Sequence, residues 1–308
     1  MAKQSVSEAD CVIQGQVIPH ELLGPLEDSA ELLGDAPRLH SRLDETGYLF
    51  LRGVLDVDDV LTAREEVFSR LIEVGEIKPP AIEGIATGES RRSELVEDLG
   101  EFWQSVSEGP KLRHVSHGPR VREIMQTVFG EPARPQDYIF LRPSPVGRST
   151  HLHYDYPFFS RGSQRVHTVW IALGDVPVTE GPLVVIEGSN RFDDLIEPVR
   201  QIDYESNDSP QVQLTGNAVE FAESRQARLL TTDFQVGDLI IFSMTTLHGT
   251  LDNQSQIGRA RLSCDVRYQP AADPIDDRYF GTVLPGTTGA GYAELNGAKP
   301  LNQPWHIR

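Results

Sequence analysis

His-Leu-His-Tyr-Asp occupies residues 151–155, and the rest of the chain is organised around this stretch. In an extended strand, side chains alternate between two faces, so His153 and Asp155 are expected to point the same way and to bind one metal ion. His248, in the distant stretch Leu-His-Gly-Thr at 247–250, is the candidate third ligand. Two histidines and one carboxylate leave coordination positions open, as a non-haem Fe(II) site requires for a bidentate molecule and dioxygen.

Other interpretations of these residues are a hydrogen-bonded His–Asp pair in a core and a cupin-like metal site. A structural zinc site would be closed by a fourth ligand, and the two cysteines, Cys11 and Cys264, lack zinc-binding spacing. A cupin site would use His151 with His153 and a nearby Glu, but no Glu occurs at 154–160. His151 is therefore a candidate for supporting the ligands or for contacting the substrate.

Length and charge restrict the function. A chain of 308 residues can bury a full core, and a formal net charge of −18 argues against nucleic acid or an anionic membrane as partner. No secretory signal and no apolar run of bilayer length is visible. We therefore expect a cytoplasmic protein with a small-molecule substrate and reduced thiols, while the sequence leaves the oligomeric state open.

The N-terminal part predicts helices. Residues 1–37 form an expected irregular leader, and 38–308 form a single domain that starts with helical support at 38–130. Apolar residues at helical spacing and acidic caps at 56–59 support this prediction. A loop is expected at 75–92 because it contains prolines and glycines without a period. The helices are expected at about 38–46, 56–74, 93–107 and 118–130.

After Pro135 the pattern changes to short apolar runs separated by Pro and Gly, which is typical of a β body. Residues 135–270 are expected to form a double-stranded β-helix, or jelly roll, flanked by helices, so the fold class is mainly β with a helical N-terminal part. The polar stretch 189–227 interrupts this body as a candidate lid or a surface insertion. The strands are expected at 137–142, 150–156, 166–173, 182–187, 228–232, 239–243, 246–250 and 259–268.

At these residues the chain resembles the Fe(II)/2-oxoglutarate-dependent oxygenases, and most closely their phytanoyl-CoA dioxygenase-like branch. The resemblance rests on His153-Tyr154-Asp155, on the glycine-led strand 237–242 that leads to His248, and on Arg259 in the following strand. It covers about residues 40–270. The cofactors that it implies are Fe(II), 2-oxoglutarate as cosubstrate, and dioxygen.

The resemblance also implies roles for residues around the triad. Arg259 is favoured as the partner of the distal carboxylate of 2-oxoglutarate, because a guanidinium matches a carboxylate with two parallel hydrogen bonds. Arg261, in an Arg-Leu-Ser motif with Ser263, stays an alternative, and Arg267 is expected in an outer salt bridge. Thr250, Trp170, Tyr138 and Ser263 are the other candidates for the cosubstrate pocket, and His151, Phe159 and Arg161 are the candidates for substrate contacts.

The activity that the resemblance implies is hydroxylation of an unactivated C–H bond in a small molecule, with succinate and CO2 as co-products. Halogenases of this fold replace the metal-binding carboxylate with a small residue, and Asp155 is intact here. A desaturase or epimerase of the same fold stays open, as does a jelly-roll binding module without catalysis. Fold alone does not separate these functions.

Overall fold

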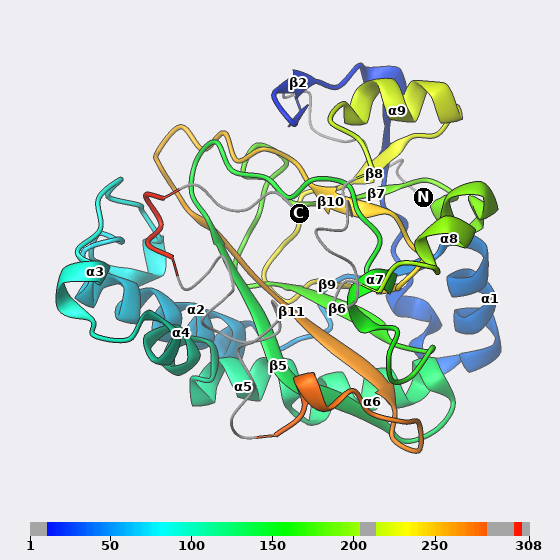
Figure 1. Cartoon of the computed structure of the whole chain (residues 1–308), viewed down its shortest axis with the longest axis horizontal. Coiled ribbons are helices and arrows are strands. Elements are labelled where there is room, and N and C mark those ends of the chain that lie inside the picture. Colours follow the sequence, from blue (N-terminus) through cyan, green and yellow to red (C-terminus); the bar gives the residue numbers. More distant parts are fainter. Residues whose placement is uncertain (1–10, 204–213, 282–298, 304–308) are drawn as a thin grey trace.

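Two β-sheets stacked face to face form the centre of the protein (Figure 1). The computed structural model describes residues 11–203, 214–281 and 299–303. The larger sheet has the order β4-β9-β6-β11-β5, and the smaller sheet has the order β10-β7-β8-β3. The larger sheet consists of β4 (Tyr48–Leu51), β5 (Ala133–Ser144), β6 (His167–Ala172), β9 (Leu239–Ser243) and β11 (Arg261–Pro270). The smaller consists of β3 (Leu23–Pro25), β7 (Leu183–Ile186), β8 (Leu229–Thr231) and β10 (His248–Thr250).

The side chains between the two sheets form an apolar cluster. Phe50, Trp170 and Phe242 extend from the larger sheet toward Leu183 and Val185 of the smaller one. Each belongs to a strand in which alternate residues face the other way, as the pleat of a strand requires. The strand pairs within the two sheets are antiparallel except for β3 with β8. This arrangement is a double-stranded β-helix, and the fold class predicted from the sequence is confirmed.

Helices cover the outer faces of both sheets (Figure 1). The outer face of the larger sheet packs against α1, α2, α4, α5 and α6, whereas α8 and α9 pack against the outer face of the smaller sheet. A short hairpin, β1 (Val12–Ile13) with β2 (Gln16–Val17), joins this second layer. The helices are α1 (Ala36–Thr46), α2 (Val57–Glu73), α3 (Arg92–Leu95), α4 (Leu99–Ser107), α5 (Pro110–His117), α6 (Pro119–Phe129), α7 (Tyr156–Phe159), α8 (Asp193–Val199) and α9 (Ala218–Arg225). Single 3-10 turns lie at His20–Leu22, Ala30–Gly34, Ala81–Glu83, Ser189–Arg191 and Asp277–Tyr279.

Local sequence signals explain several helix ends. The Asp56 side chain accepts hydrogen bonds from the backbone N–H groups of Asp58 and Asp59, so the acidic cap predicted for α2 is present. The helix expected at 93–107 is instead divided into α3 and α4. Asp98 causes this division, because its side chain accepts from Gly100 and Glu101 and starts a new helix.

Three segments differ from the sequence-based expectations. The leader, expected to be irregular, contributes β3 to the smaller sheet. Residues 150–156 form no regular strand, since one bridge at His153 is followed directly by α7. Residues 189–203 and 214–227 contain α8 and α9, whose apolar sides pack on the smaller sheet. The prediction that 189–227 is a lid stays a prediction, and its residues 204–213 lie outside the described part.

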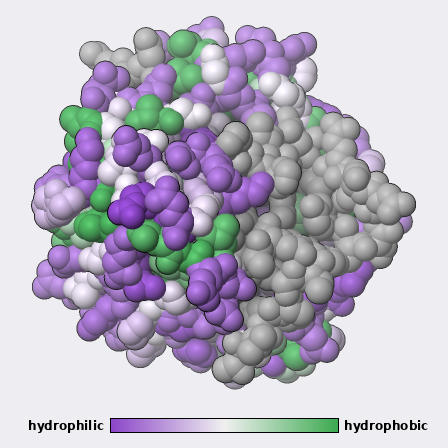
Figure 2. All heavy atoms as spheres, turned by 60° about the vertical axis from the view of Figure 1, so that its left-hand side comes forward, coloured by the Kyte–Doolittle hydropathy of each residue, from purple (hydrophilic) through white to green (hydrophobic). Residues whose placement is uncertain are grey.

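Hydrophilic side chains cover much of the described surface in Figure 2, where hydrophobic residues form separate groups. The large hydrophobic side chains that are exposed, such as Val17, Leu95 and Ile275, are scattered along the chain. Within the described ranges, no helix combines the length and the apolar character that crossing a bilayer requires. Both cysteines are buried and unpaired with each other.

Candidate metal centre

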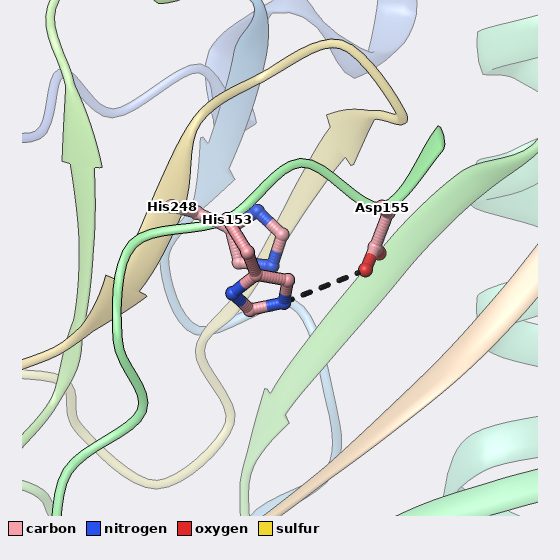
Figure 3. Close-up of side chains that lie close together, drawn as sticks. All are labelled: His153, Asp155 and His248. Carbon is pink, nitrogen blue, oxygen red and sulfur yellow. Dashed lines mark ion pairs between the residues drawn. The ribbon is translucent and has the colours of Figure 1, made fainter. Parts of the chain in front are cut away.

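His153, Asp155 and His248 meet between the two sheets (Figure 3). One ligand atom from each residue lies within 4.8 Å of the others, and all three residues are buried. The Nε2 atom of His153 is 3.7 Å from Oδ1 of Asp155, which is within the span of about 4.2 Å that two metal–ligand bonds of about 2.1 Å permit. Among the described residues no fourth His, Cys, Asp or Glu joins this cluster. The arrangement fits an open metal site.

Backbone pairing between distant segments places the two histidines. The N–H of His153 donates to the carbonyl of His248 at 2.9 Å, and the N–H of His248 donates back at 3.2 Å. Gly249 permits this close approach, because a Cβ atom there would lie 2.6 Å from the carbonyl oxygen of Thr150. The glycine after the distal histidine is therefore a steric requirement of the site.

The backbone at Asp155 does not form the strand that was expected. Its backbone is in the helical region, with φ −76° and ψ −17°, and it immediately precedes α7. Pro157 lies in the first turn of α7, where its missing N–H costs no hydrogen bond. A turn into a short helix, and not strand alternation, therefore directs the carboxylate toward the histidines.

The two imidazoles are arranged as neutral ligands. Nδ1 of His153 is 2.8 Å from the carbonyl oxygen of His151, and Nδ1 of His248 is 3.0 Å from that of Thr246. A carbonyl only accepts, so each Nδ1 carries the hydrogen and each Nε2 keeps a lone pair for a metal ion. Burial, reinforced by the neighbouring His248, lowers the pKa of His153 to about 3, and burial likewise lowers the pKa of His248.

Two donors hold the carboxylate of Asp155. Its Oδ2 accepts from Oγ1 of Thr168 at 2.5 Å and from a terminal nitrogen of Arg267 at 3.1 Å. Burial alone would raise the pKa of Asp155, but the positive charge of Arg267 and the hydrogen bond from Thr168 act against burial, and the pKa is lowered. The carboxylate is therefore ionised at neutral pH.

A small cavity adjoins the two histidines. Thr150, Trp170 and Thr250 line it, which places two of the predicted cosubstrate residues, Trp170 and Thr250, beside the metal ligands. The Oγ1 of Thr250 accepts from the backbone N–H of Thr150 at 2.7 Å. The indole N–H of Trp170 is buried and has no hydrogen-bond partner among the described residues, so a ligand in the cavity would satisfy a donor that is otherwise costly to bury.

Arg261 and Ser263 lie on the inner face of β11. The intervening Leu262 belongs to the cluster that faces the helices, so Arg261 and Ser263 face the smaller sheet. The guanidinium of Arg261 lies 6.0 Å from the Trp170 ring and donates to Oγ of Ser263 at 2.5 Å. Its Nε is buried and without a partner among the described residues. Burial, followed by the charge of Arg142, lowers the pKa of Arg261 to about 10.

Arg259 lies elsewhere. It precedes β11 and bridges to Ile85, outside the cavity lining. Its guanidinium is 3.3 Å from Oε1 of Glu180 and donates to the carbonyl oxygen of Glu83, also at 3.3 Å. The structure thus brings Arg261, and not Arg259, into the interior near Trp170.

The remaining predicted residues do not line the cavity. Tyr138 is fully buried against the Phe140 ring, with centroids 4.5 Å apart. Phe159 is also buried and packs against the same ring. Arg161 forms an ion pair with Asp203 at 2.8 Å and is 41% exposed. His151 supports His153 through its carbonyl oxygen.

Four polar residues of the site were not predicted from the sequence. Thr168 and Arg267 hold Asp155, while Arg142 and Asp265 line the cavity, joined by a hydrogen bond of 2.5 Å from Nε of Arg142. The expectation that Arg267 forms an outer salt bridge is wrong, since this side chain is 2% exposed. The signal that could have found it is the alternation of polar and apolar residues in Arg-Leu-Ser-Cys-Asp-Val-Arg at 261–267.

Several solved structures have a similar fold. EctD from S. alaskensis, solved with 2-oxoglutarate and 5-hydroxyectoine, superposes with a TM-score of 0.53 at 16% identity, covering 85% of this chain and 84% of that one. The epimerase SnoN from nogalamycin biosynthesis, solved with Fe3+, alpha-ketoglutarate and nogalamycin RO, gives 0.52 at 20% identity, covering 80% and 87%. These likenesses concern the fold.

Curated relatives extend over most of the chain. The 1-deoxypentalenic acid 11-beta-hydroxylase of Streptomyces exfoliatus is 28% identical over 277 residues, which are 86% of this chain and 91% of the relative. The peroxisomal phytanoyl-CoA dioxygenase of Bos taurus is 23% identical over 228 residues, 72% of this chain and 65% of the relative. A sequence profile of the phytanoyl-CoA dioxygenase (PhyH) family matches residues 43–261, more than half of the chain. With its metal-binding triad in the expected place, the chain belongs to the phytanoyl-CoA dioxygenase (PhyH) family, as the motifs had indicated.

Proposed function

We propose that the protein is an Fe(II)- and 2-oxoglutarate-dependent dioxygenase that hydroxylates a C–H bond of a small molecule. The observation that carries this proposal is the open triad of two neutral imidazoles and one ionised carboxylate beside a cavity that Thr250, Trp170 and Arg142 line. Bound iron would supply the oxidising chemistry, with dioxygen and 2-oxoglutarate as cosubstrates and succinate and CO2 as co-products.

The residues of the chain would bind and orient these partners. Nε2 of His153, Nε2 of His248 and Oδ1 of Asp155 would hold the metal ion, because the other polar atoms of these side chains are already engaged. The apolar surroundings of Phe242 and Leu183 would keep bulk water from the centre. Membership of the family supports these roles.

We assign the distal carboxylate of 2-oxoglutarate to Arg261 with Ser263. The Nε of Arg261 is buried and has no hydrogen-bond partner among the described residues. This guanidinium therefore requires an anion more than that of Arg259, which is already paired with Glu180. Arg142, which lines the cavity beside the two histidines, adds a second positive charge next to the carboxylate of Asp265. The resemblance favoured Arg259, and the position of the side chains favours Arg261.

Hydroxylation is proposed over halogenation because Asp155 occupies the position that a halide would need. The substrate is proposed to be a small molecule. The net charge of −18 disfavours polyanions such as nucleic acids, and a hydroxylase of a small carboxylic acid is among the relatives.

The test is an anaerobic titration of the metal-free protein with Fe(II) and then 2-oxoglutarate, followed through the weak visible charge-transfer band of the chelate. Wild type should develop the band, and Asp155→Ala should lose it. Asp203→Ala is the matched control, because it removes an aspartate that pairs with Arg161 at the surface. Absence of the band together with absence of retained iron in wild type would refute the enzyme and favour a binding module. Succinate release with candidate substrates, and identification of their products, would then separate hydroxylation from desaturation or epimerisation.

A further inference from the structure

A buried arginine lies directly behind the metal-binding carboxylate. Arg267 of β11 contacts Oδ2 of Asp155 at 3.1 Å, and both side chains are 2% exposed. Cys264 and Val266 of the same strand face the helices, so Arg267 shares the inner face with Asp265. The contact therefore follows from the register of β11 and does not depend on a surface loop.

Aromatic rings fix the orientation of this guanidinium. Its central carbon lies 4.3 Å from the centroid of the Phe140 ring and 4.4 Å from that of Phe159. The two rings are nearly perpendicular, with an interplanar angle of 87° and centroids 5.8 Å apart, so they contact the cation from adjoining sides and attract it by cation–π interaction. A second terminal nitrogen of Arg267 is 3.8 Å from Oδ2 of Asp265. The guanidinium is thus close to two aromatic rings and to two carboxylates.

The two oxygens of Asp155 have different surroundings as a result. Oδ2 accepts from both Arg267 and Thr168, whereas Oδ1 lies on the side of His153. If both oxygens were to bind one ion, Oδ2 would have to give up these two hydrogen bonds in a buried place, where an unpaired charge is costly.

We propose that Arg267 is a positioning residue that restricts Asp155 to coordination through Oδ1 and so keeps one further coordination position open for a cosubstrate. This inference rests on the proposed function, because it requires that the triad binds a metal ion. Hydrogen-bonding partners of metal ligands typically contribute about 10- to 100-fold to metal affinity. Arg267 should therefore affect both the affinity for the metal and the number of open positions.

The chain provides a matched control in Arg92. This arginine is also buried, lies 2.6 Å from the carboxylate of Glu76, and sits over the rings of Phe102 and Trp103 at 5.2 and 5.1 Å. It belongs to the helical layer and not to the metal cluster. Arg92→Met and Arg267→Met both remove a buried ion pair whose arginine packs against aromatic rings. Only Arg267→Met also removes a contact with a proposed metal ligand.

The experiment uses Mn(II) alone as the probe of the full-length protein. Electron paramagnetic resonance of free Mn(II) gives the dissociation constant, and water proton relaxation gives the number of exchangeable waters on bound Mn(II). Arg267→Met should weaken binding by about 10- to 100-fold and lower the relaxation per bound ion, because the released carboxylate oxygen displaces a water. Arg267→Lys, which keeps the charge but not the planar fork, should recover only part of both effects. Arg92→Met should bind Mn(II) as wild type does.

Each outcome decides the inference. Wild-type affinity and relaxation in Arg267→Met, or an equal loss in Arg92→Met, would overturn it while leaving the proposed function intact. Absence of Mn(II) binding by wild type would overturn the proposed function as well. If Arg267→Met does not fold, Thr168→Val decides, since it removes the other donor to Oδ2 and keeps the shape of the side chain. A fall in relaxation in that variant supports the inference, and unchanged relaxation contradicts it.

Discussion

Replacement of Arg261 by Met is the sharpest test of how the interior beside Trp170 binds an anion. Arg261 is 2% exposed, its hydrogen bond to Ser263 involves a neutral partner, and its Nε is unpaired among the described residues. A hydrogen bond to a charged group contributes about 1.5–3 kcal/mol, so loss of a bidentate pair with the distal carboxylate should cost about 3 kcal/mol. That corresponds to a rise of roughly 150-fold in the Kd of 2-oxoglutarate.

The assay is an anaerobic titration of the Fe(II)-loaded protein with 2-oxoglutarate, with Arg259→Met as the matched control. Arg259 is 28% exposed and paired with Glu180, so its replacement should leave the Kd within about threefold of wild type, the scale of a weak surface pair. The assignment to Arg261 would be refuted if Arg259→Met strongly raised the Kd of 2-oxoglutarate while Arg261→Met left that Kd at the wild-type value.

Stability gives a second readout of the same substitution. A buried cation without an anionic partner costs free energy in the folded state, and burial already lowers the pKa of Arg261 to about 10. Without 2-oxoglutarate, Arg261→Met should therefore unfold at the same denaturant concentration as wild type or at a higher one. With saturating 2-oxoglutarate, only wild type should gain stability, because ligand binding to the folded state stabilises it. A large loss of stability in the ligand-free variant would show that Arg261 has a structural partner instead.

Three further predictions address the backbone, the pH dependence and the cavity wall. Gly249→Ala should weaken Fe(II) binding and lower the free energy of unfolding by about 1–3 kcal/mol, because its Cβ would lie 2.6 Å from the Thr150 carbonyl oxygen. Isothermal titration measures the affinity for Fe(II), and urea unfolding measures the free energy of unfolding. Burial, followed by the charge of Arg113, lowers the pKa of His117 to about 4. Between pH 6.5 and 4 the unfolded chain, with a histidine pKa of about 6.5, binds a proton that the folded protein does not. The free energy of unfolding should therefore fall by on the order of 3 kcal/mol over this range. In urea unfolding, the free energy of unfolding of His117→Gln should change less steeply with pH than that of wild type. Trp170→Phe removes an indole N–H that has no hydrogen-bond partner among the described residues, and it should raise the Kd of 2-oxoglutarate about fivefold, the effect of one neutral hydrogen bond. An unchanged Kd would mean that this N–H does not bind the cosubstrate.

The metal ligands could be predicted because their residue types are specific. A His-X-Asp triplet followed by a distant histidine after a glycine-led strand is an unusual combination, and the structure brings His153, Asp155 and His248 together. The predicted local structure was nevertheless wrong at Asp155, which immediately precedes helix α7 and does not lie in a strand. A metal ion requires only that three side chains converge, so the convergence of these residues could be predicted from an incorrect local geometry.

The choice between the arginines could not be made from the strand pattern. Alternation puts Arg259 and Arg261 on the same face of an ideal strand, but β11 begins at Arg261. Arg259 lies before the strand, where its guanidinium meets Glu180. The two-residue period applies only within a regular strand, and the residue at which β11 begins depends on its pairing with β5 and β6.

The sequence by itself determined the family, the jelly roll and the three residues of the candidate metal site, because residue types, spacing and hydrophobic periodicity are local properties. Only the tertiary structure decided which polar residues support those ligands. Arg267 and Thr168 come from two neighbouring strands, and they reach Asp155 only because β11 and β6 pair in one register. Hydrogen bonds between segments far apart in the chain depend on that register, and a shift of one residue would turn both side chains to the opposite face.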